Sequence, residues 1–201
     1  MINLLPSHYY HIYNHANGNE NLFREDDNYL FFFKKYNEHI SPIVETLSYC
    51  LLPNHFHMLL KIKDEEVLLK NAFPKFRTLE KLVSANYVSK QFSNFFSSYA
   101  QSYNKKYNRT GSLFMKNFKR KAVATDEYFS KLIHYIHANP VHHGFTKDMF
   151  AWRWSSYRSF LCESPTNISR KEVLDWFGGK EAFIRFHQQP VYLKTTDMFD
   201  N

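Results

Sequence analysis

The spacing of apolar residues divides the first 140 positions of the chain into strands and helices. Apolar residues alternate with polar ones, or run together between turn residues, in four strand-like segments. In other segments they recur every three to four positions, which is typical of amphipathic helices. The predicted series is a strand at 7–15, a helix at 26–40, strands at 43–52 and 55–63, a connector with short helical pieces at 67–84, a helix at 86–104, a strand at 113–124 and a helix at 125–139.

The order of these elements indicates a fold class. Pro53 and Asn54 form a tight turn, so the strands on either side of them pair as a hairpin. Strand, helix, hairpin, helix and strand is the ferredoxin-like, split βαβ order. We therefore predict an α+β protein with a four-stranded antiparallel sheet and flanking helices, and a last helix packed beside the sheet.

The pattern changes after Pro140. Aromatic and polar residues are mixed at 152–157, and the spacing predicts one helix at 170–186. We therefore expect a main domain at 1–145, long enough for a full hydrophobic core, and a C-terminal helical extension at 146–201.

The composition is that of an ordered globular chain. Aromatic residues make up 18% of the 201 residues, while only 5 are glycine. Cys50 and Cys162 lack paired spacing, which argues against a disulfide framework and suits a reducing compartment. No apolar run approaches the roughly 18 residues that a membrane helix needs. We expect a cytoplasmic protein without a membrane span.

Positive charge is concentrated in one stretch of the chain. The formal net charge is +7, and positions 103–121 hold seven basic residues without one acidic residue. Aromatic residues lie among them, as in surfaces that stack bases while neutralising phosphates, although a solvated basic face is the simpler alternative. The candidate DNA-binding residues are Tyr103, Lys105, Lys106, Arg109, Lys116, Lys119, Arg120 and Lys121, and the interleaved aromatic residues also include Tyr107, Phe114 and Phe118.

Two histidines in the second strand of the hairpin are candidate metal ligands. Strand alternation places His55 and His57 on one face of the sheet and Phe56 on the other. Imidazoles suit a borderline divalent metal, and the absence of a nearby cysteine disfavours structural zinc. Because the chain has 11 histidines, one such pair is also expected by chance, so a hydrogen-bonded or surface pair is the alternative.

A tyrosine and an asparagine near position 140 offer a nucleophile and a further ligand. Tyr135 and Asn139 are four residues apart on a helix that Pro140 is expected to end, so they share one face. The amide oxygen could join the histidines at a metal. The phenol, with a pKa near 10, needs activation before it attacks a phosphate, and most of the 14 tyrosines are expected to be core or surface residues. His134, His137, His142 and His143 are assigned to the helix surface or to DNA contact.

Several motifs in this order resemble one known family. Residues 52–59, Leu-Pro-Asn-His-Phe-His-Met-Leu, and 135–141, Tyr-Ile-His-Ala-Asn-Pro-Val, are similar to the two signatures of single-tyrosine His-hydrophobic-His transposases. Residues 103–107, 111–114 and 154–157 further resemble the branch of REP-associated tyrosine transposases, so the similarity covers positions 7–160. The chain departs from the pattern at Leu52 and at 115–117, and neither departure touches a proposed catalytic group.

The resemblance implies a mechanism and a substrate. His55 and His57 would hold Mg²⁺ or Mn²⁺, with Asn139 as the third ligand. Tyr135 would attack a phosphate of single-stranded DNA, which forms a 5′-phosphotyrosine link and releases a 3′-hydroxyl that later reverses the step. The implied substrates are DNA hairpins formed by short palindromic repeats, and the implied enzyme is a monomer or a homodimer.

Three other functions share some of these features. A non-catalytic nucleic-acid binder could use the same scaffold, but the aromatic signature with Lys or Arg, Gly and Phe is absent from the strands. A host-adopted descendant could bind repeat hairpins without cutting them, although His55, His57, Tyr135 and Asn139 are all intact. A hydrolytic nuclease would use water in place of Tyr135, but the chain lacks the carboxylate cluster of two-metal nucleases.

Overall fold

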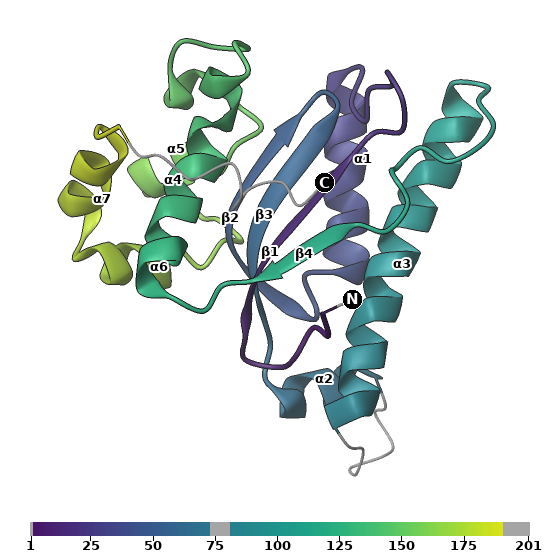
Figure 1. The fold of residues 1–201 in the computed structure, drawn as a ribbon, viewed down its shortest axis with the longest axis horizontal. Helices are drawn as coiled ribbons and strands as arrows, with labels where there is room; N and C mark the ends of the chain where they lie inside the picture. The colour runs from purple at the N-terminus through teal and green to yellow at the C-terminus, as the bar shows by residue number, and fades with distance from the viewer. Residues whose placement is uncertain (1, 73–80, 191–201) are drawn as a thin grey trace.

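The computed structural model describes residues 2–72 and 81–190 (Figure 1). Its regular elements alternate in the predicted order up to α4 and continue as short helices. They are β1 (Tyr9–His15), α1 (Asp26–His39), β2 (Val44–Leu52), β3 (His55–Ile62), α2 (Glu65–Ala72), α3 (Lys81–Lys106), β4 (Lys119–Ala122), α4 (Asp126–His142), the 3-10 helix η1 (Met149–Ala151), α5 (Tyr157–Leu161), α6 (Arg170–Phe177) and α7 (Lys180–His187). Residues 73–80 of the predicted connector and 191–201 of the predicted extension lie outside this description.

The four strands form one antiparallel sheet in the order β2-β3-β1-β4. This order confirms the predicted ferredoxin-like fold, because β3 of the hairpin returns beside β1 and β4 adds to the other side of β1. β3 is therefore a central strand, with β2 and β1 hydrogen-bonded to its two sides. Its position fixes where every side chain of the sequence 55–62 points.

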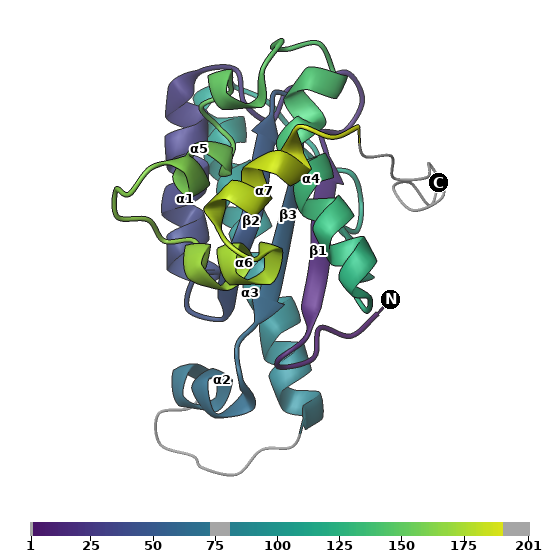
Figure 2. The same ribbon diagram turned by 90° about the vertical axis from the view of Figure 1, so that its left-hand side faces the viewer.

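Helices cover both faces of the sheet. α1 and α3 lie on one face, where Phe32, Phe56 and Phe95 belong to the same buried cluster. On the other face, α4 and the short C-terminal helices cover β2 and β3 (Figure 2), and Leu59, Ile133 and Phe183 share a second cluster. Because strand residues alternate between these two clusters, the sheet is buried on both sides.

The segment after α4 is attached to the edge of the sheet at β2. The amide of Leu51 donates to Trp154 O (2.9 Å), that of Ser156 donates to Tyr49 O (3.0 Å), and that of Ser169 donates to Thr46 O (2.8 Å). These bonds use backbone groups of β2 that would otherwise remain unpaired at a sheet edge. The extension thus shares a core with the sheet and with α4, and the domain boundary at 145 stays a prediction.

Two helix predictions were wrong in their extent. α4 continues through Pro140 to His142, because residues 132–140 are all buried and their packing outweighs the one backbone donor that proline lacks. The single helix predicted at 170–186 is two helices, since Gly178 and Gly179 have φ angles of 80° and 110°. Such angles belong to the left-handed region, where glycine ends helices.

The predicted strand at 113–124 is also shorter in the structure. Only β4 pairs as a strand, and Phe114 makes an isolated bridge with Ala16. Asn117 has a φ of 62°, which interrupts the extended backbone before β4 begins. No helix in the described part of the chain is long and apolar enough to cross a lipid bilayer.

Replacement of Gly178 by alanine tests the helix break. A Cβ atom at Gly178 would meet no heavy atom within 4 Å, so the cost is purely the left-handed backbone. We expect Gly178→Ala to lower the free energy of unfolding by about 1–2 kcal/mol in urea titrations. The control Lys171→Ala, on the exposed face of the same α6, should change it by less than about 0.5 kcal/mol. Equal stability of the two variants would show that the break does not depend on glycine.

Candidate active site

The first residues of β3 place two imidazoles under α4. His55 and His57 are 2% and 1% exposed, and their ring centroids are 5.3 Å apart. Phe56 points to the opposite face, where its ring centroid is 5.5 Å from that of Phe32. The predicted alternation is therefore confirmed, and the two histidines face the layer that contains α4.

α4 brings the predicted nucleophile and the predicted third ligand to these histidines. Asn139 Oδ1 lies 3.1 Å from Nε2 of His55, although the two residues are 84 positions apart. The ring of Tyr135 meets that of His57 edge to face, with 5.3 Å between centroids. The structure thus assembles all four residues in one site that is almost completely buried, with Tyr135 5% and Asn139 0% exposed.

The hydrogen bonds of His55 leave a pair of electron-rich atoms facing each other. Nδ1 of His55 lies 2.8 Å from Asn54 Oδ1, an amide oxygen that only accepts, so Nδ1 carries the proton. Nε2 of the neutral ring then has a lone pair, and it faces Oδ1 of Asn139. Two adjacent ligands of an octahedral ion with bonds of about 2.1 Å are about 3.0 Å apart. With the Asn139 amide in this orientation, the separation of the two atoms suits a shared cation.

Unpaired polar atoms in the same site also fit a cation. His57 Nε2 and Asn139 Nδ2 are buried without a hydrogen-bond partner among residues 2–72 and 81–190. Native proteins rarely leave such atoms unpaired unless they have a functional role. The described part of the chain holds no group of three His, Cys, Asp or Glu side chains placed to hold a metal, so a third protein ligand would be of another type, as Asn139 is.

Burial keeps the site histidines neutral. It lowers the pKa of His55 to about 3, and it lowers the pKa of His57 well below the ordinary value, with neighbouring imidazoles adding to the effect. A neutral imidazole is the form that binds a metal ion. Both side chains are therefore ready to act as ligands at neutral pH without losing a proton.

The phenol of Tyr135 is held in its protonated form. Burial raises the pKa of Tyr135 to about 12, and the nearby Asn139 amide offsets part of that rise. Attack by the phenol oxygen therefore requires a base or a cation. The ring centroid of His142 lies 6.1 Å from that of Tyr135, and partial burial of the imidazole, together with the neighbouring His143, lowers the pKa of His142.

Sequence reasoning missed two histidines that border the site. His15 stacks on His55 with 4.4 Å between ring centroids, and His11 Nε2 lies 2.9 Å from His57 Nδ1. Both residues lie on β1, in register with β3. The available signal was the alternation Tyr9, His11, Tyr13, His15, which gives one face of β1 four ring side chains. The centroid of His143, assigned to the helix surface, lies 4.7 Å from that of His55.

The assignment of His134 and His137 to the helix surface was wrong. They are 4% and 0% exposed, because the C-terminal helices cover that side of α4. His137 bonds His187 through Nδ1 (2.9 Å) and Ser156 Oγ through Nε2 (2.9 Å). No local pattern in the sequence indicates these partners, which are 50 and 19 residues away.

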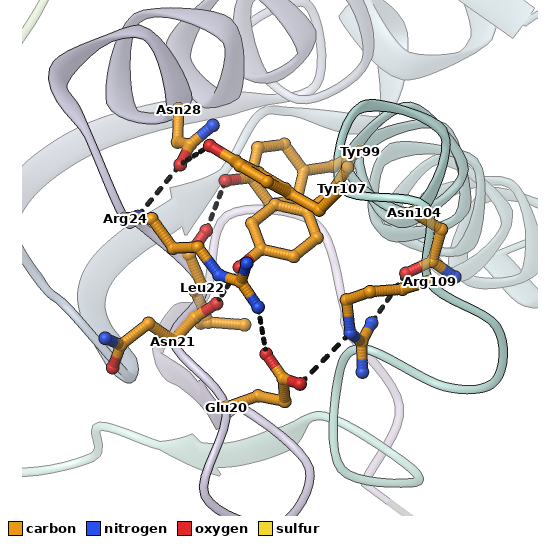
Figure 3. Close-up of polar contacts among 10 residues, drawn as sticks. Glu20, Asn21, Leu22, Arg24, Asn28, Tyr99, Asn104, Tyr107 and Arg109 are labelled. Atoms are coloured by element: carbon orange, nitrogen blue, oxygen red, sulfur yellow. Dashed lines mark hydrogen bonds and ion pairs between the residues drawn. The ribbon is translucent and has the colours of Figure 1, made fainter.

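The predicted stacking surface at 103–121 was wrong for two of its aromatic residues. Tyr103 and Phe114 are 3% and 7% exposed and belong to the core on the α1 side. Tyr99 and Tyr103 of α3 and Tyr107, which directly follows α3, are four residues apart, and their hydroxyls donate to Leu22 O (2.6 Å), Asn21 O (2.5 Å) and Asn28 Oδ1 (3.0 Å) (Figure 3). These tyrosines attach the loop before α1 to the end of α3.

Two of the predicted DNA-binding cations are engaged in the same loop attachment. Arg109 binds the carboxylate of Glu20 (3.2 Å), which also binds Arg24 (2.9 Å), as Figure 3 shows. Lys106 lies 2.7 Å from Glu25. Salt bridges at exposed positions add little stability, but they reduce the net positive charge that this end of α3 presents.

The sheet separates the remaining predicted cations. Lys119 and Lys121 are paired in register with Tyr13 and His11, so they share the face of the histidine site. Arg120 points to the other face, where it lines a groove of about 660 Å³ together with Lys116. Lys105 is exposed at the end of α3. The basic stretch therefore presents cations on both sides of the sheet rather than on one surface.

Comparison with known proteins gives one similar sequence and one similar solved structure with matching descriptions. A protein of Haemophilus influenzae named as a REP-associated tyrosine transposase is 25% identical over 115 residues, which are 56% of this chain and 58% of the relative. The similarity thus spans little more than half of that protein's length. No protein-family model matches the chain.

A solved structure shows the same fold. The structure of a REP-associated tyrosine transposase bound to a REP hairpin gives a TM-score of 0.52 at 15% identity, over 84% of this chain and 88% of that one. The chain is thus similar in sequence to one REP-associated tyrosine transposase and in fold to another, in agreement with the resemblance of its motifs.

Proposed function

We propose that the protein cleaves and rejoins single-stranded DNA beside hairpins, with Tyr135 as the nucleophile. The observation that carries this proposal is the convergence of His55, His57, Asn139 and Tyr135 in one site, built from β3 and α4. A phenol next to a cation-binding set of ligands is an arrangement for phosphoryl transfer to a tyrosine.

Two imidazoles and one amide would hold the divalent ion, Mg²⁺ or Mn²⁺. The facing atoms His55 Nε2 and Asn139 Oδ1 and the unpaired His57 Nε2 support this assignment. When bound, the ion polarises the scissile phosphate and offsets the charge that develops on its oxygens. Three protein ligands would leave room at the ion for water and for a phosphate oxygen.

The reaction conserves one phosphodiester bond in each step. The Tyr135 oxygen forms a bond to phosphorus while the bond from phosphorus to the 3′-oxygen breaks, so the 5′ phosphate becomes attached to the protein. The phenol proton leaves to a base, for which the candidate outside the proposed ligand set is neutral His142, with its ring centroid 6.1 Å from that of Tyr135, and the 3′-oxygen takes up a proton. Attack by a 3′-hydroxyl on the phosphotyrosine reverses the step and rejoins DNA.

The DNA would approach along the face of β4 that carries Lys119 and Lys121. These two cations lie on the face of the sheet that holds the histidine site, at an edge strand. Phosphate contacts from lysines position a nucleic acid without reading its sequence. The hairpin in the related structure makes a hairpin the preferred substrate to test. The cytoplasmic location and the monomeric or homodimeric state stay predictions.

The nucleophile is tested by replacing Tyr135 with phenylalanine. The DNA is a single-stranded oligonucleotide that forms a hairpin with unpaired flanks and is labelled at its 3′ end, because the protein would retain the 3′ fragment. With Mn²⁺, the wild-type protein should give a covalent adduct on a denaturing gel, and Tyr135→Phe should give none while it binds the hairpin with affinity unchanged within about twofold, since only a hydroxyl is lost.

Tyr128→Phe is the matched control, because Tyr128 is also on α4 and should leave the adduct intact. An adduct of normal yield in Tyr135→Phe would refute the nucleophile assignment. Hairpin binding by the wild type without an adduct at any metal concentration would favour a repeat-binding protein that no longer cuts.

The ligand role of the histidines is tested by binding of the metal alone. His57→Ala removes one of three proposed ligands, so Mn²⁺ affinity should fall at least 10-fold and adduct formation should be lost. Calorimetry with MnCl₂ measures the affinity, and circular dichroism checks that the variant remains folded. Wild-type affinity in a folded His57→Ala variant would contradict the proposed site.

Two further variants distinguish the DNA-contacting residues of the basic stretch from its core residues. Lys121→Ala should weaken hairpin binding and reduce its salt dependence, because one phosphate contact is lost. Tyr103→Phe should leave binding unchanged but lower the free energy of unfolding by about 1 kcal/mol, since its buried hydroxyl bonds Asn21 O. Fluorescence anisotropy at several salt concentrations and urea unfolding measure the two effects. Weaker hairpin binding by Tyr103→Phe would instead support the predicted role of Tyr103 in DNA binding.

A further inference from the structure

His11 is a second imidazole in contact with a proposed ligand. It lies in the centre of β1 and is 1% exposed, with its Nε2 atom 2.9 Å from Nδ1 of His57. Its ring is stacked against two others, with centroids 4.6 Å from Tyr13 and 5.1 Å from His57, which are themselves 5.5 Å apart. The sheet register therefore holds the two imidazoles in a fixed mutual position.

The hydrogen bond between two neutral imidazoles has only two possible arrangements. In one, His11 Nε2 carries the proton and donates it, which leaves His57 with its own proton on Nε2. In the other, His57 Nδ1 carries the proton and donates it to His11, which leaves a lone pair on His57 Nε2. Only the second arrangement lets His57 act as a ligand, since Nδ1 is already occupied by His11.

His55, the other proposed histidine ligand, also needs its proton on Nδ1, and there the acceptor is Asn54. Asn54 Oδ1 accepts the Nδ1 proton of His55 and so leaves a lone pair on His55 Nε2. Metal-binding histidines generally donate their other nitrogen to a carboxylate, a carbonyl or water. For His57 the acceptor in this chain is the neutral imidazole of His11. Nδ1 of His11 has no hydrogen-bond partner in the described part of the chain, so no competing bond fixes the proton of His11 on Nε2.

We propose that His11 is a positioning residue that accepts the Nδ1 proton of His57 and thereby directs the Nε2 lone pair of His57 into the site. The proposal rests on the ligand role of His57 in the proposed function. It assigns a role to a buried histidine that is neither a proposed metal ligand nor the proposed nucleophile.

Two substitutions distinguish the role of His11 Nε2 as a hydrogen-bond acceptor from the role of the His11 ring in stacking. His11→Phe keeps an aromatic ring for stacking but removes the acceptor, whereas His11→Gln offers an amide oxygen near the position of Nε2. His134→Phe is the matched control, because it removes another buried imidazole on the side of α4 that faces His187. Thermal unfolding identifies any variant whose fold is disturbed.

Two measurements report the role of His11. In the metal-free wild type, nitrogen chemical shifts should show His57 protonated on Nδ1, and His11→Phe should shift that population towards Nε2. Calorimetry with MnCl₂ should show affinity reduced about 10- to 100-fold in His11→Phe, and largely restored in His11→Gln. His134→Phe should bind Mn²⁺ as the wild type does.

The outcomes distinguish this proposal from the metal site itself. Wild-type Mn²⁺ affinity in His11→Phe, together with loss of binding in His57→Ala, would overturn the role of His11 and leave the metal site standing. Wild-type His57 protonated on Nε2 would also overturn it. A wild-type protein that does not bind Mn²⁺ would overturn both proposals.

Discussion

The pairing of β3 between β1 and β2 is the constraint on which the site depends. A central strand has neighbours on both sides, so a shift of its register by one residue would turn Phe56 out of the cluster on the α1 side and the histidines into that cluster. The burial of Phe56 among other aromatic rings therefore fixes the direction of His55 and His57. Fold stability and the placement of the two histidines come from the same alternation.

α4 supplies the other half of the site and is held from two sides. Its sheet-facing side carries Tyr135 and Asn139, and its outer side carries His137 within a chain of hydrogen bonds. His187 Nδ1 donates to Phe183 O, so His187 Nε2 accepts from His137, and His137 Nε2 accepts from the hydroxyl of Ser156. Each bond contributes about 1 kcal/mol, and each polar atom in it would be costly to leave unpaired. The extension thus stabilises the position of the helix that carries Tyr135, the proposed nucleophile.

Charge is distributed according to the two faces of the sheet. Lys119 and Lys121 join the face of the histidine site, while Arg109 and Lys106 bind acidic residues near the start of α1. Positive charge along an edge strand also discourages pairing with another sheet. Cations that are close in sequence therefore have different surroundings. The strand register decides which of them face the histidine site, and ion pairing decides which of them are neutralised by acidic residues.

The sequence alone predicted the fold class, the face on which His55 and His57 lie, and the shared helix face of Tyr135 and Asn139, and its motifs resembled one family. Alternation in 55–62 and helical spacing at 135–139 are local properties, and the backbone geometry of strands and helices converts them directly into directions of side chains. The tertiary structure decided what depends on distant partners: the continuation of α4 past Pro140, the burial of Tyr103 and His137, and the contact of His11 with His57. These outcomes depend on which surfaces pack together, and packing energy overrides local preference when a residue is buried from several sides.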